Sequence, residues 1–199
     1  MPPAEPTAAG RPPALLLPGG VLTLDLASVT GWAYGHLSDQ SPRFGTWHLP
    51  HTGGEGARYA AFENELAAAM DAMQPSHVVL EAALSFQALL GVSNMRVMCQ
   101  QYTLRGIAYA EAWRASCPIS EVSADIVRRE ILGQAHWPKD QVKRAVVRYC
   151  LRLGLRVPDH NAGDAVLTWL WHVGQMRSGG RGPLFASSAL LTDQRETVQ

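Results

Sequence analysis

The sequence lacks the features that mark membrane, secreted and zinc-binding proteins. No apolar run approaches the ~20 residues of a membrane-spanning helix, and "ALLL" near the start is shorter than the ~7 to 15 apolar residues of a signal peptide. Its three cysteines, Cys99, Cys117 and Cys150, are odd in number and too widely spaced for a CxxC pair or a zinc knuckle. We therefore expect a cytosolic protein with reduced thiols, no membrane span and no zinc or redox role.

An excess of charge is also lacking, because 17 Lys and Arg balance 17 Asp and Glu. This balance argues against the wholly basic surface that many nucleic-acid-binding proteins carry. The charges are nevertheless unevenly distributed. Between Arg128 and Arg156, eight basic residues stand against two acidic ones, a net charge of +6, and the rest of the chain is acidic by the same amount.

The chain has the length and composition of one globular domain. Its 199 residues are 47% hydrophobic and 17% charged, which is sufficient for a single core. The first segment is rich in Pro and Ala, and the last is rich in Gly, Ser and Arg. We expect a disordered leader over residues 1–19, one domain over 20–177 and a flexible tail over 178–199.

Hydrophobic periodicity predicts alternating strands and helices. The expected strands are a buried one over Val21–Ala33, a hairpin partner around Phe44 and Trp47, one in "HVVLEAAL", and one over Ile119–Val122. The expected helices cover Glu55–Met73, Asn94–Ser116, a brief segment after Val122, Lys139–Leu153, and the stretch following "VPDHN". Gly106, inside the second of these helices, predicts a close packing contact. This order indicates an α/β fold with a mixed sheet.

Three acidic residues occupy unusual places in this pattern. Asp25 lies between Leu24 and Leu26 in a buried strand, where a carboxylate without a partner is costly. Glu81 ends a second buried strand, and Asp164 falls in the first turn of the last helix. Strand ends and helix starts meet at one edge of an open α/β sheet, so these carboxylates can converge. Converging carboxylates stay ionised only beside cations, and hard oxygen ligands suit Mg²⁺ or Mn²⁺.

Each acid also has a plainer interpretation. Asp164 follows Asn161 by three residues, the spacing of a helix N-cap and its N3 acid. Glu81 could lie at the exit of its strand and face water. Asp25 is harder to explain without a partner.

Five motifs in order resemble the RuvC family of Holliday-junction resolvases. "LTLDLASVTGWAYG" is similar to the family's first strand, "VVLEAAL" to its second motif, "LRGIA" to part of its long helix, "PKDQVKRAVV" to the start of its basic helix, and "DHNAGDAVLTWLW" to its last motif. "DLA" in place of Asp-Pro-Gly resembles a phage-like or α-proteobacterial branch. The chain departs from the family at Asn161, where many members have an acid, and at Leu84, where an aromatic residue is common.

The resemblance implies an RNase H-like fold, with a mixed five-stranded sheet flanked by helices, and phosphodiester hydrolysis by two Mg²⁺ or Mn²⁺ ions per active site. Asp25 would bridge both ions, and Glu81 and Asp164 would each bind one. Asn161, His160 or Asp159 would complete the site, and His160 or Asp159 could instead handle the proton of the attacking water. A four-way DNA junction as substrate implies a two-fold homodimer, with the long helix from Asn94 as the seam, although core packing is the more common role of its apolar residues.

Several residues are candidates for contacting the nucleic acid. Residues four apart share a flank of a helix, so we expect a phosphate-contacting surface on the basic helix rather than an ordinary solvated face. The small residues after Asp25 would let the chain approach a phosphate, and Phe86 is the nearest replacement for the family's aromatic residue, or else a core residue. The predicted nucleic-acid contacts are Lys139, Lys143, Arg144, Arg148, Phe86 and Thr30, with Arg152 on the same flank.

Two other functions share these motifs. One is an RNase H-like nuclease acting on structured RNA or other branched DNA. The other is a non-catalytic DNA-binding scaffold of the same fold, which the neutral Asn161 favours. Actin-like ATPases share the first-strand Asp motif but need two such lobes, and this chain has one.

Overall fold

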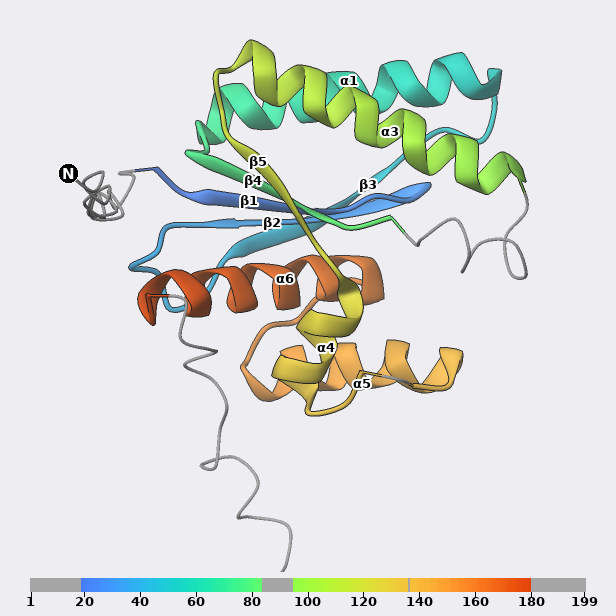
Figure 1. Ribbon diagram of the computed structural model, residues 1–199. Coiled ribbons are helices and arrows are strands. Elements are labelled where there is room, and N and C mark those ends of the chain that lie inside the picture. The colour runs from blue at the N-terminus through green and yellow to red at the C-terminus, as the bar shows by residue number, and fades with distance from the viewer. Residues whose placement is uncertain (1–18, 84–94, 136, 180–199) are drawn as a thin grey trace, which may run out of the picture.

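The computed structural model describes residues 19–83, 95–135 and 137–179, and it contains one five-stranded sheet flanked by helices (Figure 1). In sheet order the strands are β3 (Arg43–His48), β2 (Val29–Gly35), β1 (Val21–Asp25), β4 (His77–Glu81) and β5 (Ile119–Val122). β1, β2 and β3 pair antiparallel, whereas β1, β4 and β5 pair parallel. The predicted mixed five-stranded α/β sheet is therefore confirmed.

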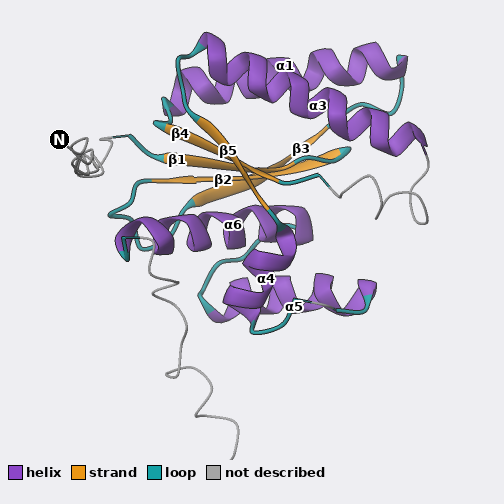
Figure 2. Ribbon diagram, in the orientation of Figure 1, coloured by secondary structure: helices purple, strands orange, loops and turns teal. Residues whose placement is uncertain are grey.

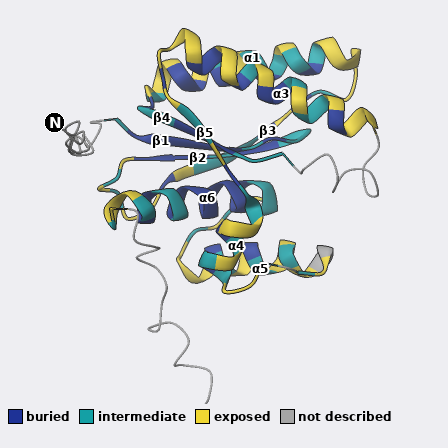
Figure 3. Cartoon of the chain, viewed as in Figure 1, coloured by how far each residue is buried: buried dark blue, intermediate teal, exposed yellow. Residues whose placement is uncertain are grey.

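Helices cover both faces of the sheet (Figures 1 and 2). α1 (Gly54–Met73) and α3 (Met95–Arg114) lie on one face. α6 (His160–Arg177) lies on the other, backed by α4 (Ala124–Leu132) and α5 (Lys139–Arg152). Because α6 is enclosed between the sheet and these two helices, it is buried along most of its length (Figure 3). No helix in the described ranges is long and apolar enough to cross a membrane.

Strand alternation divides the core into two clusters, one on each face of the sheet. Leu22 and Leu24 of β1 pack with Phe62 of α1, whereas Val21 belongs to the cluster that contains Trp169 of α6. In β4, Val78 and Leu80 likewise belong to the first cluster, and Val79 to the second. Asp25 and Glu81 are the next odd-numbered residues of β1 and β4, and they therefore turn toward the α6 face.

Two details of the predicted elements are wrong. The segment expected as one strand over Val21–Ala33 is split into β1 and β2 by a turn, in which the hydroxyl of Thr30 donates to the carbonyl of Ala27 at 2.8 Å. The predicted hairpin partner is confirmed as β3, which pairs antiparallel with β2, the second part of that segment. Gly106 makes no close contact, because a Cβ there would meet nothing within 4 Å. The predicted leader and tail fall almost wholly outside the described residues.

Candidate functional site

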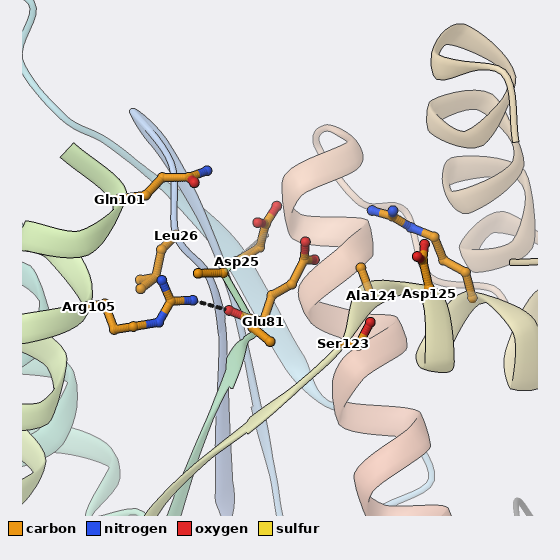
Figure 4. Close-up of a pocket in the computed structure, with 11 residues that line it drawn as sticks. Asp25, Leu26, Glu81, Gln101, Arg105, Ser123, Ala124 and Asp125 are labelled. Atoms are coloured by element: carbon orange, nitrogen blue, oxygen red, sulfur yellow. Dashed lines mark hydrogen bonds between the residues drawn. The ribbon is translucent and has the colours of Figure 1, made fainter. Parts of the chain in front are cut away.

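Two acidic side chains lie beside each other at the carboxyl ends of β1 and β4. Leu24 and Leu80 are paired in the parallel register, so Asp25 and Glu81 follow at the same edge of the sheet. Both continue the odd-numbered positions that face α6. Figure 4 shows the two side chains pointing into the same opening. Strand alternation and parallel pairing together thus bring these two carboxylates into proximity.

Asp164 approaches them because α6 packs unusually close to β2. A Cβ at Gly31, the residue paired with Asp25, would lie 2.0 Å from the carbonyl oxygen of Asn161. The hydroxyl of Thr23 in β1 also binds this part of α6, because it donates a hydrogen bond to the backbone carbonyl of Ala165 at 2.8 Å. These contacts hold the start of α6 against the edge that carries Asp25.

The burial of these carboxylates determines their electrostatics. Burial, and then the charges of Glu81 and Asp164, raise the pKa of Asp25 well above its usual value. Burial and Asp164 raise the pKa of Glu81 to about 7. Burial also raises the pKa of Asp164, although the cation of Arg128 opposes this effect. The three acids therefore form one mutually repelling group that a nearby cation would stabilise.

Two arginines from other elements complete the site. Arg128 of α4 places its Nη2 atom 3.2 Å from Oδ1 of Asp164. Arg105 of α3 donates to the backbone carbonyl of Glu81 (Figure 4), and its Nε lies 2.7 Å from Oε1 of Glu121. Asp25, Glu81 and both arginines border a cavity of about 520 Å³, whose lining also includes Gln101 and Asp125. In the sequence, Arg128 is only one of eight basic residues between positions 128 and 156.

The donor chemistry fits a divalent cation. Carboxylate oxygens are the ligands that Mg²⁺ and Mn²⁺ prefer, and added positive charge would relieve the repulsion between the acids. Within the described ranges, no three His, Cys, Asp or Glu side chains form a ready-made metal site. The side chains would therefore have to draw closer around an ion.

The start of α6 differs from the capping arrangement considered from the sequence. Asp159, rather than Asn161, is the N-cap, and its Oδ1 accepts a hydrogen bond from the backbone N–H of Ala162 at 2.9 Å. Asp164 lies beyond the cap and contacts Arg128, so its role is not capping. Asp159 still raises the pKa of Asp25, and a charged His160 lowers that of Asp164, so both belong to the surroundings of the site.

The predicted nucleic-acid contacts are placed unevenly. Lys143, Arg144 and Arg148 are exposed on α5, and the charge of Lys143 lowers the pKa of Asp164. Thr30 is fully buried and bonds within its own turn, so the prediction that it contacts nucleic acid is wrong. Phe86 lies outside the described residues, as does the side chain of Lys139.

Comparisons with known proteins identify the fold. No family model matches the sequence, and no curated protein matches it either. The Thermus thermophilus RuvC structure is 16% identical with a TM-score of 0.58, covering 83% of this chain and 99% of that one. T. thermophilus RuvC in complex with a Holliday junction substrate is 14% identical with a TM-score of 0.60 and the same coverage. The yeast mitochondrial Holliday junction resolvase Ydc2 is 10% identical with a TM-score of 0.53, covering 81% and 82%.

These similarities extend over most of the chain at low sequence identity. They support the fold inferred from the five motifs, whereas the narrower phage-like or α-proteobacterial assignment has no support among them. The chain therefore has the RNase H-like fold of the RuvC Holliday-junction resolvases.

Proposed function

We propose that this protein is a structure-specific endodeoxyribonuclease that resolves four-way DNA junctions by paired, symmetric nicks. The observation that carries the proposal is that Asp25 and Glu81 line one cavity of a RuvC-like fold, while Asp164 acts on the pKa of both and contacts Arg128 at the edge of that cavity. When bound, two Mg²⁺ or Mn²⁺ ions would supply an activated water and would stabilise the leaving 3′ oxygen.

The side chains of the site would have distinct tasks. Asp25 would bridge the two ions, and Glu81 and Asp164 would each bind one. Arg105 would position Glu81 by holding its backbone carbonyl. His160 or Asp159, at the start of α6, would accept the proton of the attacking water. Asn161 could supply a neutral oxygen, although it would not balance any charge.

The exposed side of α5 is the proposed DNA-binding surface. Lys143, Arg144 and Arg148 are all exposed, and residues three or four apart on a helix are neighbours. Lys143 is close enough to the site to affect the pKa of Asp164. A strand whose phosphates contact α5 would therefore run toward the carboxylates.

The outward face of α3 is the proposed dimer seam. It exposes Met95, Tyr102, Tyr109 and Trp113, with Trp113 81% exposed, whereas Leu104 faces the core. The spacing of seven, seven and four residues places the exposed side chains on one stripe. A second copy would cover this stripe and bring two active sites to one junction. Light scattering should show a dimer for the wild type and a monomer for Trp113→Glu. A wild-type monomer would contradict the seam.

The decisive experiment is cleavage of a synthetic four-way junction. We expect nicks in Mg²⁺ or Mn²⁺, no nicks in EDTA, and intact junction binding without cleavage by Asp25→Asn. Binding by the wild type without metal-dependent cleavage would support a non-catalytic scaffold instead. Equal cleavage of linear duplex or RNA would support a broader nuclease.

The scaffold alternative rests on Asn161 and can be tested separately. If the amide limits metal binding, Asn161→Asp should raise the cleavage rate at a low Mg²⁺ concentration. Asn161→Ala is the matched control, because it removes the ligand atom without adding charge. Equal rates for all three proteins would mean that Asn161 is not a ligand.

A further inference from the structure

Arg128 forms an ion pair with Asp164 at the edge of the site. α4 is packed on the core through the buried residues Val127 and Ile131. The side chain of Arg128, on the same helix, is only 20% exposed and lies at the edge of the cavity. Its Nη2 atom donates to Asp164 at 3.2 Å, and its buried Nε atom has no hydrogen-bond partner in the described part of the protein. Among the described residues, the enclosed guanidinium is thus held by a single, long hydrogen bond.

The charge of Arg128 acts on all three carboxylates. Burial opposes this charge, but Asp164, Glu81 and Asp25 outweigh the effect and raise the pKa of the guanidinium. In return, Arg128 lowers the pKa of each carboxylate. One permanent positive charge therefore partly balances a group of acids that burial would otherwise leave uncompensated.

We propose that Arg128 is a built-in counter-ion of the metal-free site and that its guanidinium must release Asp164 before this carboxylate can ligate a metal ion. This inference rests on the proposed metal-dependent function, and it adds a regulatory element to the same site. Arg128 stabilises the protein without metal and lowers its affinity for metal, so the site fills at higher concentrations of the ion than it would without Arg128.

The surroundings of Arg128 allow such a release. Asp125 lies three residues earlier on α4, is exposed, and lines the same cavity. Residues three apart on a helix are neighbours, so Asp125 can receive the released guanidinium. The movement would require only new side-chain rotamers of Arg128, because the single hydrogen bond to Asp164 is the one that breaks.

The test compares Arg128→Gln with Arg129→Gln, a matched variant that removes the same charge from an exposed neighbour on α4. Isothermal titration with Mn²⁺ alone should show about tenfold tighter binding by Arg128→Gln than by the wild type, which corresponds to about 1.4 kcal/mol. Arg129→Gln should change the affinity less than twofold. In EDTA, Arg128→Gln should melt about 2 to 4 °C below the wild type, and saturating Mn²⁺ should remove the difference.

The outcomes separate this inference from the proposed function. Equal or weaker Mn²⁺ binding by Arg128→Gln would overturn the counter-ion role while leaving a metal-dependent nuclease intact. A complete lack of Mn²⁺ binding in all three proteins would overturn both. If Arg128→Gln fails to fold, Arg128→Lys is tested in its place, because an ammonium group lacks the planar guanidinium and should hold Asp164 less well. Unchanged Mn²⁺ affinity in that variant would overturn the inference.

Discussion

Replacing Gly31 by alanine should damage the active site more than the fold. The new Cβ would lie 2.0 Å from the carbonyl oxygen of Asn161, 2.2 Å from its carbonyl carbon and 2.7 Å from the amide nitrogen of Ala162. All three are backbone atoms of α6, and ordinary contacts begin near 3.4 Å. The start of α6 would therefore have to move by more than 1 Å, and Asp164 would move with it.

The structure allows both effects of this change to be estimated. Overpacking of this kind costs about 1 to 3 kcal/mol of unfolding free energy. A displacement of about 1 Å at reacting groups costs about 10²-fold in rate. We expect urea denaturation to show the first effect, and junction cleavage in saturating Mg²⁺ to show the second in molecules that remain folded.

The control is Gly56→Ala in α1, where a Cβ meets nothing within 4 Å. This exposed helical position should gain about 0.5 to 1 kcal/mol of stability and keep the wild-type cleavage rate. If Gly31→Ala retained the wild-type cleavage rate, the close approach of β2 and α6 would not be what positions Asp164.

Three further predictions address the helix cap, the basic helix and a histidine pair. Asp159→Ala should lose about 1 kcal/mol of unfolding free energy, whereas Asp159→Asn keeps a capping oxygen and should lose almost none; equal losses in urea denaturation would contradict the cap. In the double variant Arg144→Gln/Arg148→Gln, the slope of the logarithm of the junction-binding constant against the logarithm of the salt concentration should become shallower by about 2. An unchanged slope would mean that neither residue contacts a phosphate. Burial, and then His77, lower the pKa of His172 to about 4. The folded protein therefore binds fewer protons than the unfolded chain between the usual histidine pKa and 4, so up to about 3 kcal/mol of stability is present at neutral pH and is lost as the pH falls through this range. His172→Gln should flatten that part of the profile of unfolding free energy against pH, and a profile of wild-type steepness would refute the assignment.

The parts of the site that depend on local periodicity could be predicted from the sequence. Asp25 and Glu81 each end a buried strand, and the alternation of side chains fixes the face that they occupy. Their proximity then requires only that the two strands pair in parallel, which the α/β order already indicated. Most predicted helices and the strand Ile119–Val122 agree with the structure to within about two residues.

The remaining features depend on contacts between distant segments. The break between β1 and β2 falls in an uncharged run of strand-forming and small residues after Asp25, and it is fixed by the hydrogen bond from Thr30 to Ala27 and by pairing with β3. Arg128 is one of eight basic residues in its region, and only the packing of α4 on α6 selects it. Gly31 and Gly106 look alike in sequence, yet only Gly31 has a backbone pressed against it.

The first turns of α6 combine requirements of the fold with requirements of the site. Asp159 caps the helix, the backbone of Asn161 rests on Gly31, and Asp164 meets Arg128, all within six residues. Because capping and close packing fix the backbone of this segment, Asp164 can change partner only through its side chain and that of Arg128. Replacement of the Arg128 guanidinium by a metal ion therefore needs no movement of the sheet or of α6. Metal affinity should accordingly respond to substitutions on α4, which supplies Arg128, rather than to the cap itself. Asp159→Asn keeps the capping oxygen and removes only a charge that acts on Asp25, so it should lower Mn²⁺ affinity less than twofold in calorimetry, and a loss of tenfold or more would show that its carboxylate also serves the metal site.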